Sequence, residues 1–319
     1  MRLPTPARAY RGTQARVSAV AVEAQRRRED RQEQQARVDW PLAIDDGSRL
    51  TLVVANHNGL ALIGQLVFGL HRVLDRGEVH RLVVVDNAST DGSVALLETL
   101  QDAGLVTLVR RHDRPYHGPG LNAGLSFLAA RQEDPDFRTD LVGVMDSDVF
   151  ALRPGGLSAA AGMLRDSGAA MSGPARGEMV PFYAHPSLLL VDPSQVWRGP
   201  VPVFREHGAP GIPMQAHLRA TGAQILTFPF YKFRYFLHLG HGTVMNLDDH
   251  GHRSNRYHPW ARTGLQHHYE QDPAGPELHE LWSAAFTREV ELPTVDALVA
   301  ACLRPERVDV LGGRDPHAL

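Results

Sequence analysis

The chain is poor in three features that would each have pointed to a class of protein. Cys302 is its only cysteine, which excludes an intrachain disulfide and a metal centre built from several thiolates. No apolar run reaches about 18 residues, and the N-terminus lacks an apolar signal-peptide core, so we expect neither a membrane span nor a leader. Lys232 is the only lysine among 33 basic residues. Any site for an anionic ligand must therefore be built almost without lysine.

The composition is that of an ordinary globular protein. Of the 319 residues, 43% are hydrophobic and 22% are charged, which is enough material for one large domain or two small ones. The net charge of −3 gives no bulk electrostatic reason to expect nucleic acid as a partner. We therefore expect a cytoplasmic enzyme.

Changes in pattern divide the chain into four predicted parts. Residues 1–48 form a polar extension, either a solvated helix or a disordered arm, with contact to a second subunit in a homodimer as the alternative. Residues 49–175 are predicted to bind the main ligand, residues 176–260 to form a smaller subdomain, and residues 261–319 to form a helical C-terminal segment.

Apolar runs and helical repeats alternate between residues 50 and 164. This alternation predicts an α/β fold with a doubly wound, mostly parallel sheet, whose ligands bind at the carboxyl ends of the strands. Beyond residue 175 the alternation breaks down. The expected strands are 52–55, 82–85, 105–109, 141–145, 187–191 and 223–228, and the expected helices are 62–74, 94–100, 118–130, 157–164, 213–222 and two within 273–302.

One short peptide, Met145-Asp146-Ser147-Asp148, follows the fourth predicted strand. Two carboxylates that flank a small residue at the end of a buried strand can hold a hard divalent cation, and the cation can in turn hold a diphosphate. Asn56 and Asp86 follow two other strands, so they are expected at the same edge of the sheet. We expect Asp148 to face solvent.

Four motifs occur in the order typical of glycosyltransferase family 2, which the chain resembles. They are VVANHNG at 53–59, VVVDNASTDGS at 83–93, GPGLNAG at 118–124 and MDSD at 145–148. The resemblance is strong over residues 50–150 and loose over 175–245. It implies a GT-A fold and a metal-dependent, inverting transfer of a sugar from a nucleoside-diphosphate sugar to a hydroxyl of a small-molecule or carrier-bound acceptor.

The resemblance also implies roles for single residues. Asp148 would bind Mn²⁺ or Mg²⁺ directly, and Asp146 would contact the ribose or the metal. Asp86 would accept hydrogen bonds from the base or the ribose, and His57 stands where the family often has an aromatic residue that stacks on the base. The predicted nucleotide-sugar pocket consists of Asn56, His57, Asn58, Asp86, Asn87, Gly118, Asn122 and Asp146.

Some residues in these motifs also have a structural interpretation. Asp91 can cap the helix that begins near Gly92. The glycines Gly118, Gly120 and Gly124 can let the backbone approach a ligand, or can simply belong to a loop and a helix start.

The chain has 17 histidines, most of them expected at the surface. Similar enzymes often supply a further metal ligand from a histidine well after the Asp-x-Asp peptide. His238 is the first candidate and His241 the second, with a pair of structural histidines as the alternative. His185 precedes a predicted strand that often lines the acceptor pocket.

The sequence gives little indication of which residue is the catalytic base. An inverting transfer needs a group that takes the proton of the acceptor hydroxyl. The segment that is acidic in similar enzymes corresponds to residues 208–222, which contain no carboxylate. Glu206 and His207 are the nearest candidates, followed by Glu178, and a retaining transfer, which needs no such base, stays open.

Two other enzyme functions lack the sequence segment that they would need, and one binding function stays open. A sugar-nucleotide nucleotidyltransferase would need a basic, lysine-containing loop after the first strand, and that loop is absent. A metal-dependent hydrolase would need a His-x-Asp or His-Glu-x-x-His segment, which is also absent. A glycosyltransferase-like domain that binds or scaffolds without turnover stays open because the acidic segment is missing.

Overall fold

A computed structural model describes residues 40, 49–112, 117–174, 184–197, 204, 211–239, 274–290 and 294–319. Apart from Trp40, the predicted polar extension lies outside these residues. All statements below concern the described part of the chain.

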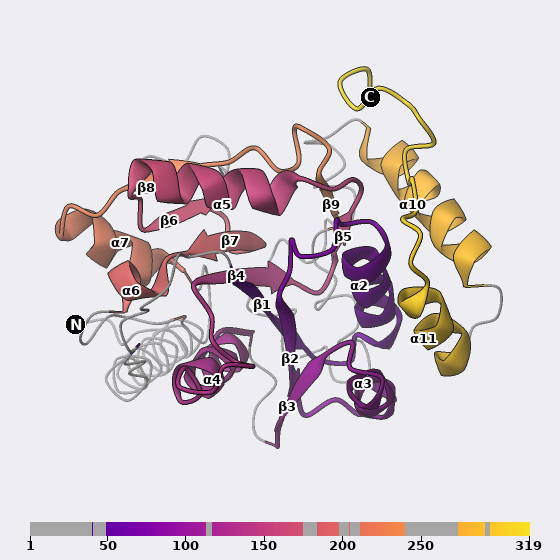
Figure 1. Ribbon diagram of the computed structural model, residues 1–319, viewed down its shortest axis with the longest axis horizontal. Coiled ribbons are helices and arrows are strands. Elements are labelled where there is room, and N and C mark those ends of the chain that lie inside the picture. Colours follow the sequence, from indigo (N-terminus) through magenta and orange to yellow (C-terminus); the bar gives the residue numbers. More distant parts are fainter. Residues whose placement is uncertain are drawn as a thin grey trace, which may run out of the picture.

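Seven strands form a central sheet in the order β3-β2-β1-β4-β7-β6-β8 (Figure 1). Strand β1 pairs in parallel with β2 and β4, β2 with β3, and β6 with β8, while β7 runs antiparallel to both β4 and β6. The mostly parallel α/β fold expected from the sequence is therefore confirmed. The strands are β1 (Leu50–Asn56), β2 (Arg81–Asn87), β3 (Thr107–Arg111), β4 (Leu141–Asp146), β6 (Met171–Gly173), β7 (Leu188–Val191) and β8 (Ile225–Thr227).

Helices cover both faces of this sheet, and two hydrophobic clusters lie between the layers. Strand β1 is buried at all seven positions because alternate side chains enter opposite clusters: Leu52 and Val54 enter one, Val53 and Ala55 the other. The first cluster includes α2 (Leu60–Arg72), α3 (Ser93–Asp102), α5 (Gly156–Ser167), α10 (Gly275–Glu289) and α11 (Val295–Leu303). The second includes α4 (His117–Ala129), α6 (Pro193–Val196) and α7 (Ile212–Ala220).

A separate two-stranded sheet, which the sequence did not indicate, pairs β5 (Val149–Ala151) with β9 (Phe236–His238). Each strand has three residues, too few for an alternating pattern to be read. Strand β6 has three residues and helix α6 has four, so both are also too short to show a periodic pattern in the sequence. Strand β3 begins at Thr107, later than the predicted 105, because Leu105 still donates its N–H to the carbonyl of Leu100 at the end of α3.

The C-terminal helices α10 and α11 are joined to α2 by a buried arginine. Arg72 donates to the carbonyls of Ala301 and Glu306 and to the carboxylate of Glu289, 3.0 Å away. Burial raises the pKa of the nearby Cys302 thiol to about 12, while Arg72 lowers it, so this lone thiol is unreactive at neutral pH. Among the described helices, none is long and apolar enough to cross a membrane.

Candidate metal and nucleotide-sugar site

Two separate strand pairs bring the metal-ligand candidates together. Strand β4 ends at Asp146, and Ser147 and Asp148 form the turn into β5. Strand β9 lies antiparallel to β5, with His238 opposite Val149, and the N–H of Leu239 donates to the carbonyl of Asp148. A residue 90 positions away in the sequence is thereby fixed beside the Asp-x-Asp peptide.

The three side chains are arranged as a set of metal ligands. Nε2 of His238 lies 3.7 Å from Oδ2 of Asp146 and 3.4 Å from Oδ1 of Asp148. One ligand atom from each residue can be chosen so that all three lie within 4.8 Å of one another. Two carboxylates and one imidazole are donors that suit Mn²⁺, and Mg²⁺ accepts the carboxylates readily. These residues therefore fit a divalent cation.

The electrostatics of the pair also favour a cation. Burial raises the pKa of Asp146 above its ordinary value; His117 and His238 lower it, and the nearby Asp148 carboxylate raises it. The expectation that Asp148 faces solvent is wrong, because the residue is only 4% exposed. It is buried because the β5–β9 pair and His238 cover the turn. Two poorly solvated carboxylates repel each other, and a bound cation relieves that repulsion.

His117, the first residue of α4, is not among the site residues predicted from the sequence. Its Nε2 lies 3.2 Å from Oδ1 of Asp146, on the carboxylate oxygen that does not face His238. This nitrogen is buried and, among the described residues, makes no hydrogen bond of acceptable geometry. The only signal in the sequence was its position directly before Gly118 of the third motif.

The loops after β1 and β2, which hold most of the predicted nucleotide pocket, are joined to each other by side chains. Asn56 donates to Oδ1 of Asp86, 3.1 Å away, and Oδ2 of Asp86 accepts the N–H of Ser89. Asn58 donates its N–H to Ser89 and accepts the N–H of Thr90. Asn56 Oδ1 is buried and has no hydrogen-bond partner in the part of the chain that the structure describes. The arrangement holds the two strand ends together beside the Asp-x-Asp peptide.

Backbone strain is concentrated at the same place. Asn58 and Ala88, one after each strand, have positive φ angles of 49° and 57°. Non-glycine residues adopt this left-handed conformation at a cost, and such positions are common at functional sites. The strain agrees with a ligand-binding role for these loops.

His57 and Asn87 point into the protein. His57 is 7% exposed, and its Nδ1 donates to the carbonyl of Asn87, 2.8 Å away. Asn87 Oδ1 accepts from Arg111. A Cβ at Gly120 would lie 2.3 Å from Nδ2 of Asn87, so this glycine is needed for α4 to pack against β2. At least part of the glycine pattern in the third motif is thus structural.

Asn122 and Asp91 both bind the backbone of other segments. The amide of Asn122 donates to the carbonyl of Phe204 and accepts its N–H, with distances of 2.8 and 3.0 Å. Asp91 accepts the N–H groups of Ser93 and Leu60, and so caps α3 and α2 together. The capping interpretation of Asp91 is therefore confirmed.

The side of the site formed by β7 carries a chain of hydrogen bonds. Tyr231 and Ser187 have their hydroxyl oxygens 2.7 Å apart, and Ser187 Oγ lies 2.9 Å from Nδ1 of His185. Nδ1 also accepts the N–H of Ser187, so in the neutral imidazole the proton is on Nε2. The Tyr231 ring stacks on His238 at 5.7 Å, and the His185 ring lies 5.8 Å from it. His185 is thus beside the metal-ligand set, as a hydrogen-bond donor through Nε2.

Two further features help to keep the hydrogen bonds between Tyr231, Ser187 and His185 in place. Burial raises the pKa of Tyr231 well above its ordinary value; the hydrogen bond with Ser187 lowers it, and Asp146 and Asp148 raise it, so the phenol stays protonated. The buried side chain of Gln215, on α7, accepts the N–H of Ala184 and donates to its carbonyl, which fixes the segment that carries His185.

The candidate bases Glu206 and His207 lie outside the described residues, as do Glu178 and the second metal-ligand candidate His241. Their proposed roles stay predictions.

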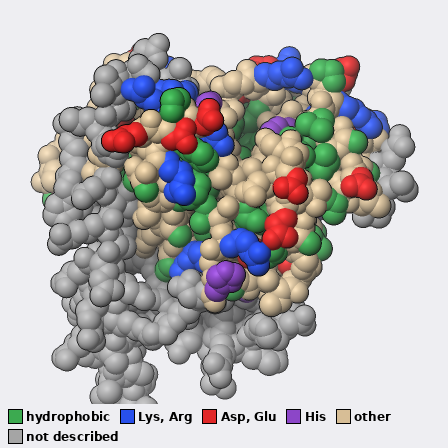
Figure 2. All heavy atoms as spheres, turned by 60° about the horizontal axis from the view of Figure 1, so that its bottom comes forward, with side chains coloured by type: hydrophobic (Ala, Val, Ile, Leu, Met, Phe, Trp, Pro, Cys, Tyr) green, Lys and Arg blue, Asp and Glu red, His purple; other side chains and the backbone are tan. Residues whose placement is uncertain are grey.

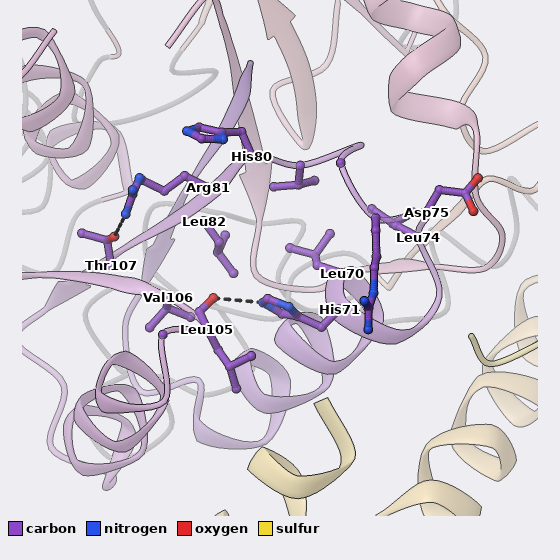
Figure 3. A pocket seen from close by; sticks show the side chains of 14 residues that line it. Leu70, His71, Leu74, Asp75, His80, Arg81, Leu82, Leu105, Val106 and Thr107 are labelled. Carbon is purple, nitrogen blue, oxygen red and sulfur yellow. Dashed lines mark hydrogen bonds between the residues drawn. The ribbon is translucent and has the colours of Figure 1, made fainter. Parts of the chain in front are cut away.

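A cavity of about 300 Å³ lies at the opposite edge of the sheet (Figure 3). It is lined by residues at the end of α2 and at the beginnings of β2 and β3. His71 donates to the carbonyl of Leu105 there, and Arg81 donates to Thr107 and to the carbonyl of Asp136. Because ligands of such sheets bind at the carboxyl ends of the strands, this cavity is separate from the candidate site.

The family profile described as Glycosyl transferase family 2 matches residues 51–212, just over half of the chain. The chain belongs to glycosyl transferase family 2. The matched region contains the strand ends that carry Asn56, Asp86, Asp146 and Asp148. No curated protein sequence matches the chain.

Several solved structures resemble the family 2 fold of this chain. TarS 1-349 of S. aureus is 14% identical, with a TM-score of 0.44, over 62% of this chain and 63% of that one, which is less than two thirds of its length. Mannosyltransferase PcManGT from Pyrobaculum calidifontis, in complex with GDP-Man and Mn²⁺, is 18% identical, with a TM-score of 0.45, over 95% and 88%.

Glucosyl-3-phosphoglycerate synthase from Mycobacterium tuberculosis, in complex with Mn²⁺, UDP and glucosyl-3-phosphoglycerate, is 18% identical, with a TM-score of 0.42, over 60% of this chain and 77% of that one. The family assignment of this chain rests on the sequence profile.

The surface agrees with the near-neutral composition, since acidic and basic side chains of the described residues are intermingled on the face drawn in Figure 2.

Proposed function

We propose that this family 2 member transfers a sugar from a nucleoside-diphosphate sugar to a hydroxyl group of a small-molecule or carrier-bound acceptor, with inversion at the anomeric carbon and with a divalent cation. One observation carries the proposal: Asp146, Asp148 and His238 lie together at the carboxyl edge of the sheet. They do so in a chain whose strand-end motifs match the family. Mn²⁺ suits this ligand set better than Mg²⁺, because one ligand is an imidazole.

One group of residues would bind the cation, and another would bind the nucleotide. Asp146, Asp148 and His238 would bind the cation, which when bound neutralises charge on the diphosphate as it leaves. The loops that carry Asn56, His57, Asn58, Asp86 and Asn87 would bind the base and ribose. Their mutual hydrogen bonds preorganise them for this role.

The remaining groups would serve the sugar and the acceptor. Gly118 follows His117 at the start of α4, near Asp146, and its backbone would contact the diphosphate or the sugar. His185 would donate a hydrogen bond through Nε2 on the β7 side of the site. This orientation makes neutral His185 a donor rather than the base, so Glu206 or His207 is proposed to take the proton of the acceptor hydroxyl.

The proposal is tested with the full chain, Mn²⁺ and a panel of UDP-, GDP- and dTDP-sugars, by measuring release of the nucleoside diphosphate. We expect slow, Mn²⁺-dependent hydrolysis of at least one donor, lost in Asp148→Asn. Asp91→Asn is the matched control, because this aspartate lies at the same edge of the sheet but accepts hydrogen bonds from the N–H of Leu60 and from Ser93. Absence of metal-dependent binding or hydrolysis with every donor would sink the proposal.

Inversion needs a separate readout. Once an acceptor is found, the anomeric configuration of the product is read by proton NMR. A product with the configuration of the donor would show a retaining transfer and remove the need for Glu206 or His207.

A further inference from the structure

His117 differs from His238 in how it meets Asp146. Each imidazole lies beside a different oxygen of that carboxylate: His238 near Oδ2 at 3.7 Å and His117 near Oδ1 at 3.2 Å. His238 joins Asp146 and Asp148 in the compact ligand set, whereas His117 is not part of it. The ligand atoms of that set all lie within 4.8 Å of one another, and because His117 does not join the set it is badly placed to share the cation.

The helix that carries His117 is fixed in position by close packing. A Cβ at Gly120 would lie 2.3 Å from Asn87, and one at Gly124 would lie 2.5 Å from Val53, so α4 contacts β1 and β2 directly through glycines. The placement of His117 at the carboxyl edge is therefore set by the core. Its Nε2 is the buried atom that this packing leaves without a hydrogen bond.

A buried nitrogen without a hydrogen bond is costly, and one lying 3.2 Å from a carboxylate oxygen needs only a small rotation to make one. Hydrogen bonds at catalytic sites are often misaligned before the ligand binds and tighten afterwards. Carboxylates that bind metals are themselves held by hydrogen bonds from outside the coordination sphere.

We propose that His117 is a positioning residue for the cation site. Nε2–H of His117 donates to Oδ1 of Asp146 when a cation is bound, and so turns Oδ2 toward Asp148 and His238. This inference rests on the proposed function, because it assumes the cation site formed by those three residues. His117 acts on the cation site by orienting Asp146 and makes no direct bond to the metal.

The test measures Mn²⁺ binding to the full chain without donor, by loss of the free Mn²⁺ signal in electron paramagnetic resonance. His117→Phe keeps a planar ring and removes both nitrogens, and we expect Mn²⁺ affinity to fall about tenfold, the lower end of what loss of such an outer partner costs. His117→Gln places an N–H near the position of Nε2 and should stay within about twofold of the wild type. His117→Asn is too short to do so and should resemble His117→Phe.

His71→Phe is the matched control. This histidine is also on a helix and also donates from Nε2, but its acceptor is the carbonyl of Leu105 at the opposite edge of the sheet (Figure 3). Its loss should leave Mn²⁺ affinity unchanged, even if the thermal midpoint falls. If His117→Phe does not fold, the Gln and Asn variants provide the same contrast.

A double-mutant cycle tests whether His117 affects Mn²⁺ affinity through Asp146. In the Asp146→Ala background, His117→Phe should cause no further loss of Mn²⁺ affinity. Wild-type affinity in His117→Phe and His117→Asn, or an undiminished loss in the Asp146→Ala background, would overturn the inference. Neither result touches the proposed function, which fails separately if Asp148→Asn binds Mn²⁺ as tightly as the wild type.

Discussion

Two pairs of aspartates lie at the carboxyl ends of β2 and β4, the strands on either side of β1, and they have different surroundings. After β2, Asp86 accepts from Asn56 and the N–H of Ser89, and Asp91 accepts from Ser93 and the N–H of Leu60. After β4, Asp146 and Asp148 lie near each other and near the imidazoles of His117 and His238. The first pair binds protein N–H groups that hold loops together.

The second pair is different because its neighbours are imidazoles. An imidazole can bind a cation directly, or donate a hydrogen bond to a carboxylate that binds one. Burial raises the pKa of Asp146, whereas hydrogen bonds from Ser93 and Leu60 lower the pKa of Asp91 even though burial opposes them. Carboxylates at one edge of one sheet therefore divide into those that accept hydrogen bonds from the protein and those that lie near each other and near imidazoles. The neighbouring groups, rather than the residue type, make the division.

The largest expected effect is that of Asp148→Asn. It removes one negative ligand from the site, and we expect Mn²⁺ affinity to fall by more than the roughly 10- to 100-fold that loss of an outer partner costs. The free energy of unfolding without metal should not fall, because the change also removes repulsion with Asp146. Titration with Mn²⁺ and urea unfolding of the apo protein check the two parts. A large loss of apo stability would show that Asp148 stabilises the fold, as Asp91 does.

His238→Asn should have the next largest effect. It replaces an imidazole with an amide, and we expect the affinity for Mn²⁺ to fall more than the affinity for Mg²⁺, because imidazole contributes more to binding of the softer ion. Competition titrations with the two cations measure the ratio. Equal losses for both would contradict a direct bond from His238 to the metal.

Tyr231→Phe should have a smaller effect on the same site. The phenyl ring can still stack on His238, but the hydroxyl that pairs with Ser187 is lost. We expect about 1 kcal/mol less stability and a loss of Mn²⁺ affinity smaller than that of His238→Asn. Urea unfolding and Mn²⁺ titration of the same samples check both. A loss of Mn²⁺ affinity as large as that of His238→Asn would mean that the hydroxyl itself serves the cation.

Asp91→Asn should have the smallest effect and should leave Mn²⁺ affinity unchanged. It removes one of two acceptor oxygens that cap α2 and α3, at a cost of about 1 kcal/mol or less near neutral pH. The pKa of Asp91 is lowered in the folded protein, so its contribution is complete above the unfolded value, about pH 4, and is lost as the pH falls below it. The stability difference between variant and wild type should therefore shrink as the pH is lowered to about 3.5.

Much of the fold and part of the site could be predicted from the sequence, because both depend on local patterns. Buried parallel strands such as β1 and β2 are continuous apolar runs, and the strand ends Asn56, Asp86 and Asp146 follow from them. His238 was a candidate only through the family resemblance. Its placement depends on the β5–β9 pair, whose strands are three residues long and far apart in the sequence.

Other parts could not be predicted, because they depend on long-range packing. His117 meets Asp146 only because Gly120 and Gly124 bring α4 against the sheet. The Tyr231–Ser187–His185 chain joins segments 44 residues apart. The burial of Asp148 follows from the same β5–β9 pair that places His238, which is why the expectation of a solvent-facing carboxylate was wrong.

The central claim is that Asp146, Asp148 and His238 hold one divalent cation. It is tested most directly by anomalous diffraction from crystals of the full chain soaked with Mn²⁺. The account predicts one strong manganese peak about 2 Å from an oxygen of Asp148 and from Nε2 of His238, and its disappearance in Asp148→Asn. A wild-type crystal with no peak between these residues, or with a peak that persists unchanged in the variant, would contradict it.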